Sequence, residues 1–242
     1  MAKRINMPHG SLVPGSAICS LVLLAVLAFT AQADSSMYSA PPSIDTPVNL
    51  PSAALSTVCE RPDERTLDAI VQVATDHGSR ASGVVFDDNR VLTAAHAIQG
   101  AGQFFVHVEG GYRSADLIMV DHTHDLAVLA VNTAWIEPLV ISGFNSIQSA
   151  TVWAAGYPRA QAMKMSAGVF TQVNDTTLYT SATIDSGQSG GGLLSCSRGR
   201  WSLAGMLRGY GAYLQGDHYV KLENHSVSVA GTTINDFLLN YQ

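Results

Sequence analysis

The chain has 242 residues, enough for one sizeable domain or for two small barrels that share one site. It carries 13 lysine and arginine residues against 19 aspartate and glutamate residues, and it contains no long basic run. A chain with this excess of acidic residues lacks the positive surface that binds phosphate backbones, so we expect no nucleic-acid partner.

The N-terminus has the pattern of an export signal. Basic residues in MAKR precede a 13-residue apolar run at 17–29, and AQA at 31–33 has the small-residue form of a cleavage site. Such a run is shorter than a membrane-spanning helix. We therefore assign residues 1–33 to a secretory signal peptide and expect a secreted or periplasmic protein that leaves the membrane after cleavage. An uncleaved membrane anchor is the alternative.

The next segment lacks a periodic pattern. Residues 34–58 contain four prolines, which predicts a flexible, Pro-rich leader over residues 34–62 and a folded domain over residues 63–242. Removing Lys3 and Arg4 with the signal leaves 11 basic and 19 acidic side chains, a net charge of −8.

From about Asp63, short β-favouring runs alternate with Gly, Asp and Asn. Their regular spacing favours an all-β barrel or sandwich over βαβ units, which need a helix between strands. Only residues 232–242 have helical spacing, with Ile234, Phe237 and Leu238 on one face and a threonine available as a cap. We detect no internal repeat. The candidate strands lie at 69–75, 82–86, 104–108, 115–120, 126–131, 151–156, 168–173, 177–183, 191–196, 201–207 and 218–222.

Glycines surround a single serine in SATIDSGQSGGGLL, residues 181–194. One interpretation is a hairpin turn, because glycine adopts positive φ without strain. The other is a nucleophile loop around Ser189, in which glycines allow a substrate backbone to approach and aim backbone N–H groups at it. The stretch alone does not decide between them.

A serine nucleophile needs a base and a carboxylate that orients the base. RVLTAAHAI places His96 directly after a strand, and HTHDLAVLAV places Asp125 directly before an apolar strand. Each residue alone is more often structural. His122 and His124 lie beside Asp125, but with Asp121 they would crowd one short loop, so we expect no metal there.

In the order His96, Asp125, Ser189, the chain resembles the chymotrypsin/trypsin-like serine proteases. LTAAH matches the histidine motif of that family, DLAVL its aspartate motif, and GQSGG its nucleophile motif. The resemblance spans about residues 67–240, and the residues of these motifs are most similar to those of bacterial HtrA-type proteases. Only 53 residues follow Ser189, so we expect no PDZ domain.

The resemblance implies two six-stranded antiparallel β-barrels with a short C-terminal helix, and a serine endopeptidase that needs no cofactor. Ser189 would be the nucleophile, His96 the general base and Asp125 its orienting acid, with the N–H groups of Gly187 and Ser189 as the oxyanion hole. We expect protein or peptide substrates and a monomeric enzyme. The alternatives are a catalytically silent binding protein and a serine esterase. An α/β-hydrolase fold is disfavoured because it needs the order Ser, acid, His.

Specificity is also implied by the resemblance. The family's pocket-base position corresponds to Thr183, and the pocket wall to the strand segment after Gly205. Small to medium apolar residues are therefore expected at the cleavage site. Asp185 would change this preference if its carboxylate entered the pocket, and Arg208 would favour acidic residues if it reached the pocket mouth. The predicted wall residues are Met206, Leu207, Arg208 and Gly209.

Two further expectations concern activation of the enzyme and disulfide formation. Gln188 is neutral and cannot form the ion pair that activates digestive relatives, so the chain cut after Ala33 is expected to be active without further trimming. Cys59 and Cys196 are the two cysteines left after cleavage, and in an exported chain they are candidates for a disulfide. Two buried thiols are the alternative.

Overall fold

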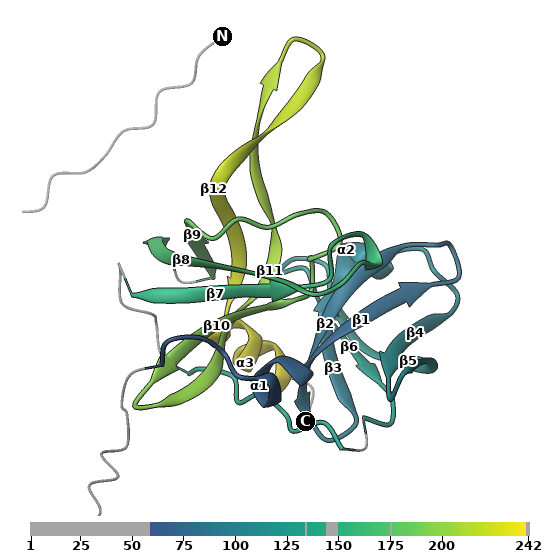
Figure 1. Cartoon of the computed structure of the whole chain (residues 1–242). Coiled ribbons are helices and arrows are strands. Elements are labelled where there is room, and N and C mark those ends of the chain that lie inside the picture. Colours follow the sequence, from purple (N-terminus) through teal and green to yellow (C-terminus); the bar gives the residue numbers. More distant parts are fainter. Residues whose placement is uncertain (1–58, 134, 144–149, 175, 241–242) are drawn as a thin grey trace, which may run out of the picture. The chain divides into compact units, whose positions relative to one another are not determined.

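The structure is a computed structural model that describes residues 59–133, 135–143, 150–174 and 176–240 (Figure 1). The predicted signal peptide and nearly all of the predicted leader lie outside these residues. The described strands form two closed antiparallel barrels of six strands each. The prediction of an all-β fold with two six-stranded barrels and a short C-terminal helix is therefore confirmed.

The first barrel is built from short strands joined by tight connections. Its strand order is β1-β2-β3-β6-β5-β4. A short helix α1 (Glu64–Asp68) precedes it, and a one-turn helix α2 (Ala95–Ile98) follows β3. The strands are β1 (Ile70–Thr75), β2 (Arg80–Asp87), β3 (Arg90–Ala94), β4 (Phe104–Val108), β5 (Gly111–Asp121) and β6 (Leu126–Ala130).

The second barrel has the order β10-β11-β12-β9-β8-β7. A short 3-10 turn, η1 (Pro158–Ala160), follows its first strand, and α3 (Gly231–Leu239) follows its last. The strands are β7 (Thr151–Gly156), β8 (Lys164–Val173), β9 (Thr177–Thr180), β10 (Gly192–Ser197), β11 (Arg200–Gln215) and β12 (His218–Ala230).

Branched and aliphatic side chains on the inner faces of the strands form the core. The largest buried cluster continues from the first barrel into β10, β11 and α3, so the two barrels pack directly on each other. Helix α3 buries Ile234 and Phe237, as its spacing predicts, and Leu238 is partly buried against the same cluster. Its N-cap is Ala230, which has no capping side chain, so the predicted threonine cap is wrong.

Strands β11 and β12 are the longest of the described strands, and their hairpin extends beyond the rest of the barrel (Figure 1). Strand β10 pairs with β11 only as far as Met206, and β9 pairs with β12 only from Ser226. We call residues 208–225, which lie between these limits, the hairpin arm.

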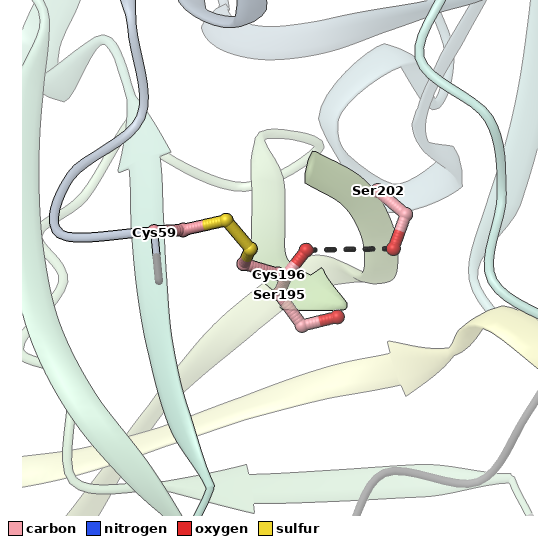
Figure 2. Close-up of a disulfide and its surroundings, with 4 residues drawn as sticks. All are labelled: Cys59, Ser195, Cys196 and Ser202. Atoms are coloured by element: carbon pink, nitrogen blue, oxygen red, sulfur yellow. Dashed lines mark hydrogen bonds between the residues drawn. A yellow bond between two sulfur atoms is a disulfide. The ribbon is translucent and has the colours of Figure 1, made fainter. Parts of the chain in front are cut away.

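A disulfide joins Cys59 to Cys196 near the end of β10, with their Cα atoms 6.0 Å apart (Figure 2). It connects the start of the described chain to the second barrel across a separation of 137 residues. Beside it, the hydroxyl of Ser202 donates to the carbonyl oxygen of Ser195 at 3.4 Å. The predicted pairing of the two cysteines is therefore present in the fold.

Candidate active site

The ends of β3 and β6 bring His96 and Asp125 together. The two strands are paired, with Ala94 opposite Leu126, so the residues that follow one strand and precede the other are neighbours. The N–H of Ala95 donates to the Asp125 carbonyl, which fixes the local backbone. The Asp125 carboxylate then accepts from the His96 backbone N–H at 2.8 Å and from the His96 Nδ1–H at 2.7 Å.

The Asp125 side chain is only 7% exposed, yet its carboxylate stays charged in this setting. Burial alone raises its pKa, but the side-chain and backbone hydrogen bonds from His96 outweigh burial, and the Arg208 charge adds to them. The pKa of Asp125 therefore lies below its ordinary value. The Arg208 Nε lies 3.4 Å from Asp125 Oδ2, the carboxylate oxygen that accepts from the His96 ring.

Ser189 lies between β9 and β10 and lines a cavity of about 350 Å³ together with His96 and Gly187. Among the described residues, the partner of its hydroxyl is the Arg208 carbonyl oxygen at 3.2 Å, rather than the His96 ring. A catalytic hydrogen bond to His96 therefore requires the Ser189 side chain to turn. Such bonds are often long or absent without substrate.

Backbone geometry beside Ser189 fixes the direction of the Gly187 N–H. Gly187 has φ +94, and a Cβ there would collide with the backbone nitrogen of Arg159. The Arg159 N–H donates to the Ser186 carbonyl at 3.0 Å. In a trans peptide the carbonyl and the N–H point in opposite directions, so the Gly187 N–H points away from Arg159. This position therefore requires glycine.

Ser82 on β2 fastens the Ser189 loop to the first barrel. Its backbone N–H donates to the Ser189 carbonyl at 2.9 Å, and its hydroxyl donates to the Gly187 carbonyl at 2.9 Å. The same hydroxyl accepts from the Tyr157 N–H at 2.8 Å. Ser82 is fully buried, so these bonds are shielded from water. It holds both sides of the loop that carries the predicted nucleophile.

Residues 81–206, more than half of the chain, match the trypsin-like peptidase domain family. The chain belongs to this family. Its members are serine endopeptidases, which agrees with the resemblance noted in the sequence. None of the curated proteins matches the chain.

Solved structures with the same fold are also proteases. The peptidase is similar to the active form of the Rv3671c protease from M. tuberculosis (TM-score 0.62, 19% identity, covering 72% of this chain and 80% of that chain). It is equally similar to a serine endoprotease from Yersinia pestis (TM-score 0.62, 22% identity, 75% and 68% covered). A third match is the HtrA-type protease AlgW with a tripeptide (TM-score 0.62, 19% identity, 72% and 60% covered).

The predicted specificity residues of the peptidase are only partly gathered at the cavity. Gly209 lines it, and the Thr183 hydroxyl instead donates to Asn224 at 3.2 Å. Met206 and Leu207 are fully buried in the two cores and line neither cavity beside His96. Their assignment to the pocket wall is corrected, because a side chain without exposed surface offers a substrate nothing to contact.

Asp185 lines the cavity of the peptidase that also contains Ser189. The Lys221 ammonium lies 2.8 Å from its carboxylate and the Lys164 ammonium 3.5 Å away. The hydrogen bond from Lys221 is the largest cause of a pKa below the ordinary value for Asp185. Gln188 is buried and holds this loop with its neutral amide, accepting from the Asp185 N–H and donating to the Lys164 carbonyl.

The second cavity of the peptidase, of about 610 Å³, also contains His96 and is lined by His122, Asp125 and Arg208. His124 turns to Asp121 at 2.7 Å rather than to the cavity. Within the described residues, no group of three or more histidine, cysteine or acidic side chains is placed to hold a metal ion. No helix in that part of the chain is long and apolar enough to span a membrane.

Sequence reasoning missed three contributors to this site. Ser82 and Arg159 act through backbone contacts with residues that are distant in the chain, and neither belongs to a motif. Arg208 was considered as a specificity residue, but its guanidinium contacts Asp125. In the sequence, the one indication of a special role for Ser82 was its position before Gly83, at the start of an apolar strand.

Proposed function

We propose that the chain hydrolyses peptide bonds with Ser189 as nucleophile, His96 as general base and Asp125 as the group that orients His96. The observation that carries the proposal is the 2.7 Å hydrogen bond from His96 Nδ1 to a buried Asp125 carboxylate, with Ser189 in the same cavity as His96. This bond leaves His96 Nε2 as the ring nitrogen available to accept a proton.

The reaction proceeds in two stages, formation of an acyl-enzyme and its hydrolysis. The Ser189 oxygen attacks the carbonyl carbon and its proton passes to His96 Nε2, while the negative oxygen accepts hydrogen bonds from the N–H groups of Gly187 and Ser189. The C–N bond then breaks, and His96 returns the proton to the leaving amine. Water hydrolyses the resulting acyl-enzyme by the same proton route, which regenerates the serine hydroxyl.

Apolar residues of small to medium size are the proposed cleavage-site preference. Asp185 lines the cavity, but Lys221 and Lys164 offset the charge of its carboxylate, so it provides little attraction for a basic side chain. Arg208 is engaged by Asp125, which weakens the alternative of acidic substrates. A peptide library separates the three preferences, and efficient cleavage after lysine or arginine would contradict this one.

We also propose that the protein is exported. Residues 1–33 act as a secretory signal, residues 34–62 as a leader, and residues 63–242 as the catalytic domain. The Cys59–Cys196 disulfide supports an oxidising compartment such as the periplasm or the exterior. The neutral amide of Gln188 holds the loop before Ser189, which supports activity without a newly released N-terminus.

A fluorophosphonate titration tests the mechanism. The protein cut after Ala33 should gain the mass of one phosphonyl group on Ser189 and lose peptide hydrolysis in proportion. Ser189→Ala should neither react nor hydrolyse, whereas the control Ser195→Ala, on β10 outside the two cavities, should do both. A wild-type protein that neither reacts nor cleaves would favour a silent binding protein. Cleavage of esters alone would favour an esterase.

A further inference from the structure

The hairpin arm has open edges on both sides. Within the described chain, the strand pairing of residues 208–225 joins β11 only to β12, because the pairing of β11 with β10 ends at Met206 and the pairing of β12 with β9 starts at Ser226. An open strand edge offers unpaired backbone N–H and C=O groups to an added strand. An isolated two-stranded hairpin is also marginally stable alone.

The arm starts at the candidate nucleophile. Ser189 donates its hydroxyl proton to the Arg208 carbonyl, and Gly209 and Tyr210 line both cavities that contain His96. The Tyr210 hydroxyl shares a hydrogen bond with the Ser186 hydroxyl at 3.3 Å. A peptide bound at Ser189 therefore lies beside the first open residues of the arm.

One face of the arm continues the cleft. The Lys221 ammonium lies 5.3 Å from the centre of the Tyr210 ring and 2.8 Å from the Asp185 carboxylate, which lines the Ser189 cavity. The face of the arm that carries Lys221 is therefore turned toward the nucleophile loop. Because Asp185 offsets the Lys221 charge, this part of the face presents little net charge.

The same face ends in an exposed apolar pair. Ala212 pairs with Lys221, and two residues further along Leu214 pairs with Tyr219, so both pairs lie on one face of the hairpin. Leu214 is 61% exposed and Tyr219 is 77% exposed. Tyr213 pairs with Val220 on the opposite face.

We propose that this cleft-side face of the arm is an extended substrate-binding surface. A substrate segment adds to the open edge of β11 and places an apolar side chain on the Leu214–Tyr219 pair. From Tyr210 to Leu214 the strand rises about 13 Å, so that side chain lies roughly four to six residues from the scissile bond. The preferred substrates are unfolded or extended protein segments with apolar residues, rather than short peptides. This inference rests on the proposed function.

Continuity with the cleft is the reason for assigning the face to substrate rather than to a second copy of the chain. The open edge begins next to Ser189, and the apolar pair lies on the face that also contacts the nucleophile loop. Such strand addition draws affinity from backbone hydrogen bonds and specificity from alternate side chains. It thus extends a short cleft without requiring a deep pocket.

The test compares a short and a long peptide with the same cleaved sequence. The long peptides are extended by six residues on one side or the other, with or without leucine or phenylalanine four to six residues from the scissile bond. We expect the ratio of kcat/KM for the long apolar peptide to that for the short peptide to fall about tenfold, through KM, in Leu214→Ser/Tyr219→Ser. The matched control on the opposite face, Tyr213→Ser/Val220→Thr, should keep the wild-type ratio.

Binding separates a failure of this inference from a failure of the proposed function. Fluorescence anisotropy of the labelled long peptide is measured with Ser189→Ala, alone and combined with each double variant. Loss of binding only in the cleft-face variant supports the arm even if the wild-type protein hydrolyses no peptide. Equal binding or equal ratios in both double variants would overturn the proposal. A change of sedimentation coefficient in the cleft-face variant would overturn it in favour of an interface between copies.

Discussion

The two barrels have the same strand order, and corresponding connections of each carry the candidate site. The connection from β3 to β4 carries His96, and its counterpart from β9 to β10 carries Ser189. The connection from β5 to β6 carries Asp125, and its counterpart from β11 to β12 is the turn at the tip of the hairpin arm. One topology thus positions all four segments, but the two barrels contribute different groups to the candidate site.

In the proposed mechanism, the first barrel supplies the base and its orienting acid, and the second supplies the nucleophile together with backbone groups. Asp125 and His96 contribute a carboxylate and an imidazole that tight connections hold against each other. Around Ser189, the proposed backbone groups are the N–H groups of a glycine-rich loop and the open edge of β11. The first contribution should therefore respond to side-chain substitutions alone, whereas the second should respond to backbone-altering substitutions as well.

The largest expected effect is that of Asp125→Asn. The amide keeps the size of the side chain but favours the wrong His96 tautomer, and we expect kcat to fall about 10⁴-fold. The matched control is Asp121→Asn, because Asp121 also holds a histidine, His124, at 2.7 Å. Steady-state hydrolysis of a peptide amide measures both. Equal losses in the two variants would show that the Asp125–His96 pair has no special role.

In the second barrel, Gly187→Ala should lower kcat by about 10²–10³-fold, the usual loss for one oxyanion-hole donor. The new Cβ would collide with the Arg159 backbone and displace the Gly187 N–H. Gly110→Ala is the control, because Gly110 has φ +74 with open space around its Cβ position. It should lose some stability and keep kcat. A similar kcat in both variants would contradict the assignment of the Gly187 N–H.

Local patterns predicted most of the fold. The run at 104–108 coincides with β4, because five alternating, β-favouring residues need only local propensity to become a strand. The run at 201–207 ends eight residues before β11 does. Residues 208–215 contain two glycines and no apolar alternation, and they form a strand through cross-strand pairing with β12. The repeated strand order was not visible because it resides in connectivity, not in sequence identity.

The site was predictable where its residues belong to motifs. His96, Asp125 and Ser189 are marked by short motifs in a fixed order; in the structure His96 is hydrogen-bonded to Asp125 and lines the same cavity as Ser189. Ser82 and Arg159 carry no such mark, because each contacts backbone atoms of residues that are distant in the chain: Ser82 reaches across from the first barrel, and Arg159 contacts Ser186 within the second. The Met206 and Leu207 assignment failed since it transferred strand positions without knowing which side chains the cores bury.

The disulfide tests how firmly the second barrel is tied to the start of the domain. Cys59→Ser/Cys196→Ser should lower the free energy of unfolding by about 2–4 kcal/mol, mainly by freeing the unfolded chain. Urea unfolding of the oxidised wild type, the reduced wild type and the double variant measures this effect. The last two should agree. Two free thiols in the mass spectrum of the unreduced protein would contradict the pairing.

The smallest expected effect concerns Arg208, a side chain of the second barrel that contacts Asp125. The Asp125 pKa is lowered, so its interactions stabilise the fold above the ordinary value of about 3.9 and are lost as pH falls through the lower folded pKa. Arg208→Leu removes one cause of that lowering. The Arg208 side chain is 46% exposed, so the loss at pH 7 should stay below about 1 kcal/mol.

The pH dependence of the Arg208→Leu effect on unfolding free energy shows whether Arg208 interacts with Asp125. The difference in unfolding free energy between wild type and Arg208→Leu should be largest at neutral pH and should shrink as pH falls below the ordinary Asp125 value, where the carboxyl becomes protonated. In an Asp125→Asn background the same substitution should give a difference that no longer varies over this range. A difference that keeps its pH dependence in that background would assign the Arg208 interaction to a group other than Asp125. A constant difference in both backgrounds would mean that Arg208 stabilises the fold through packing of its aliphatic stem.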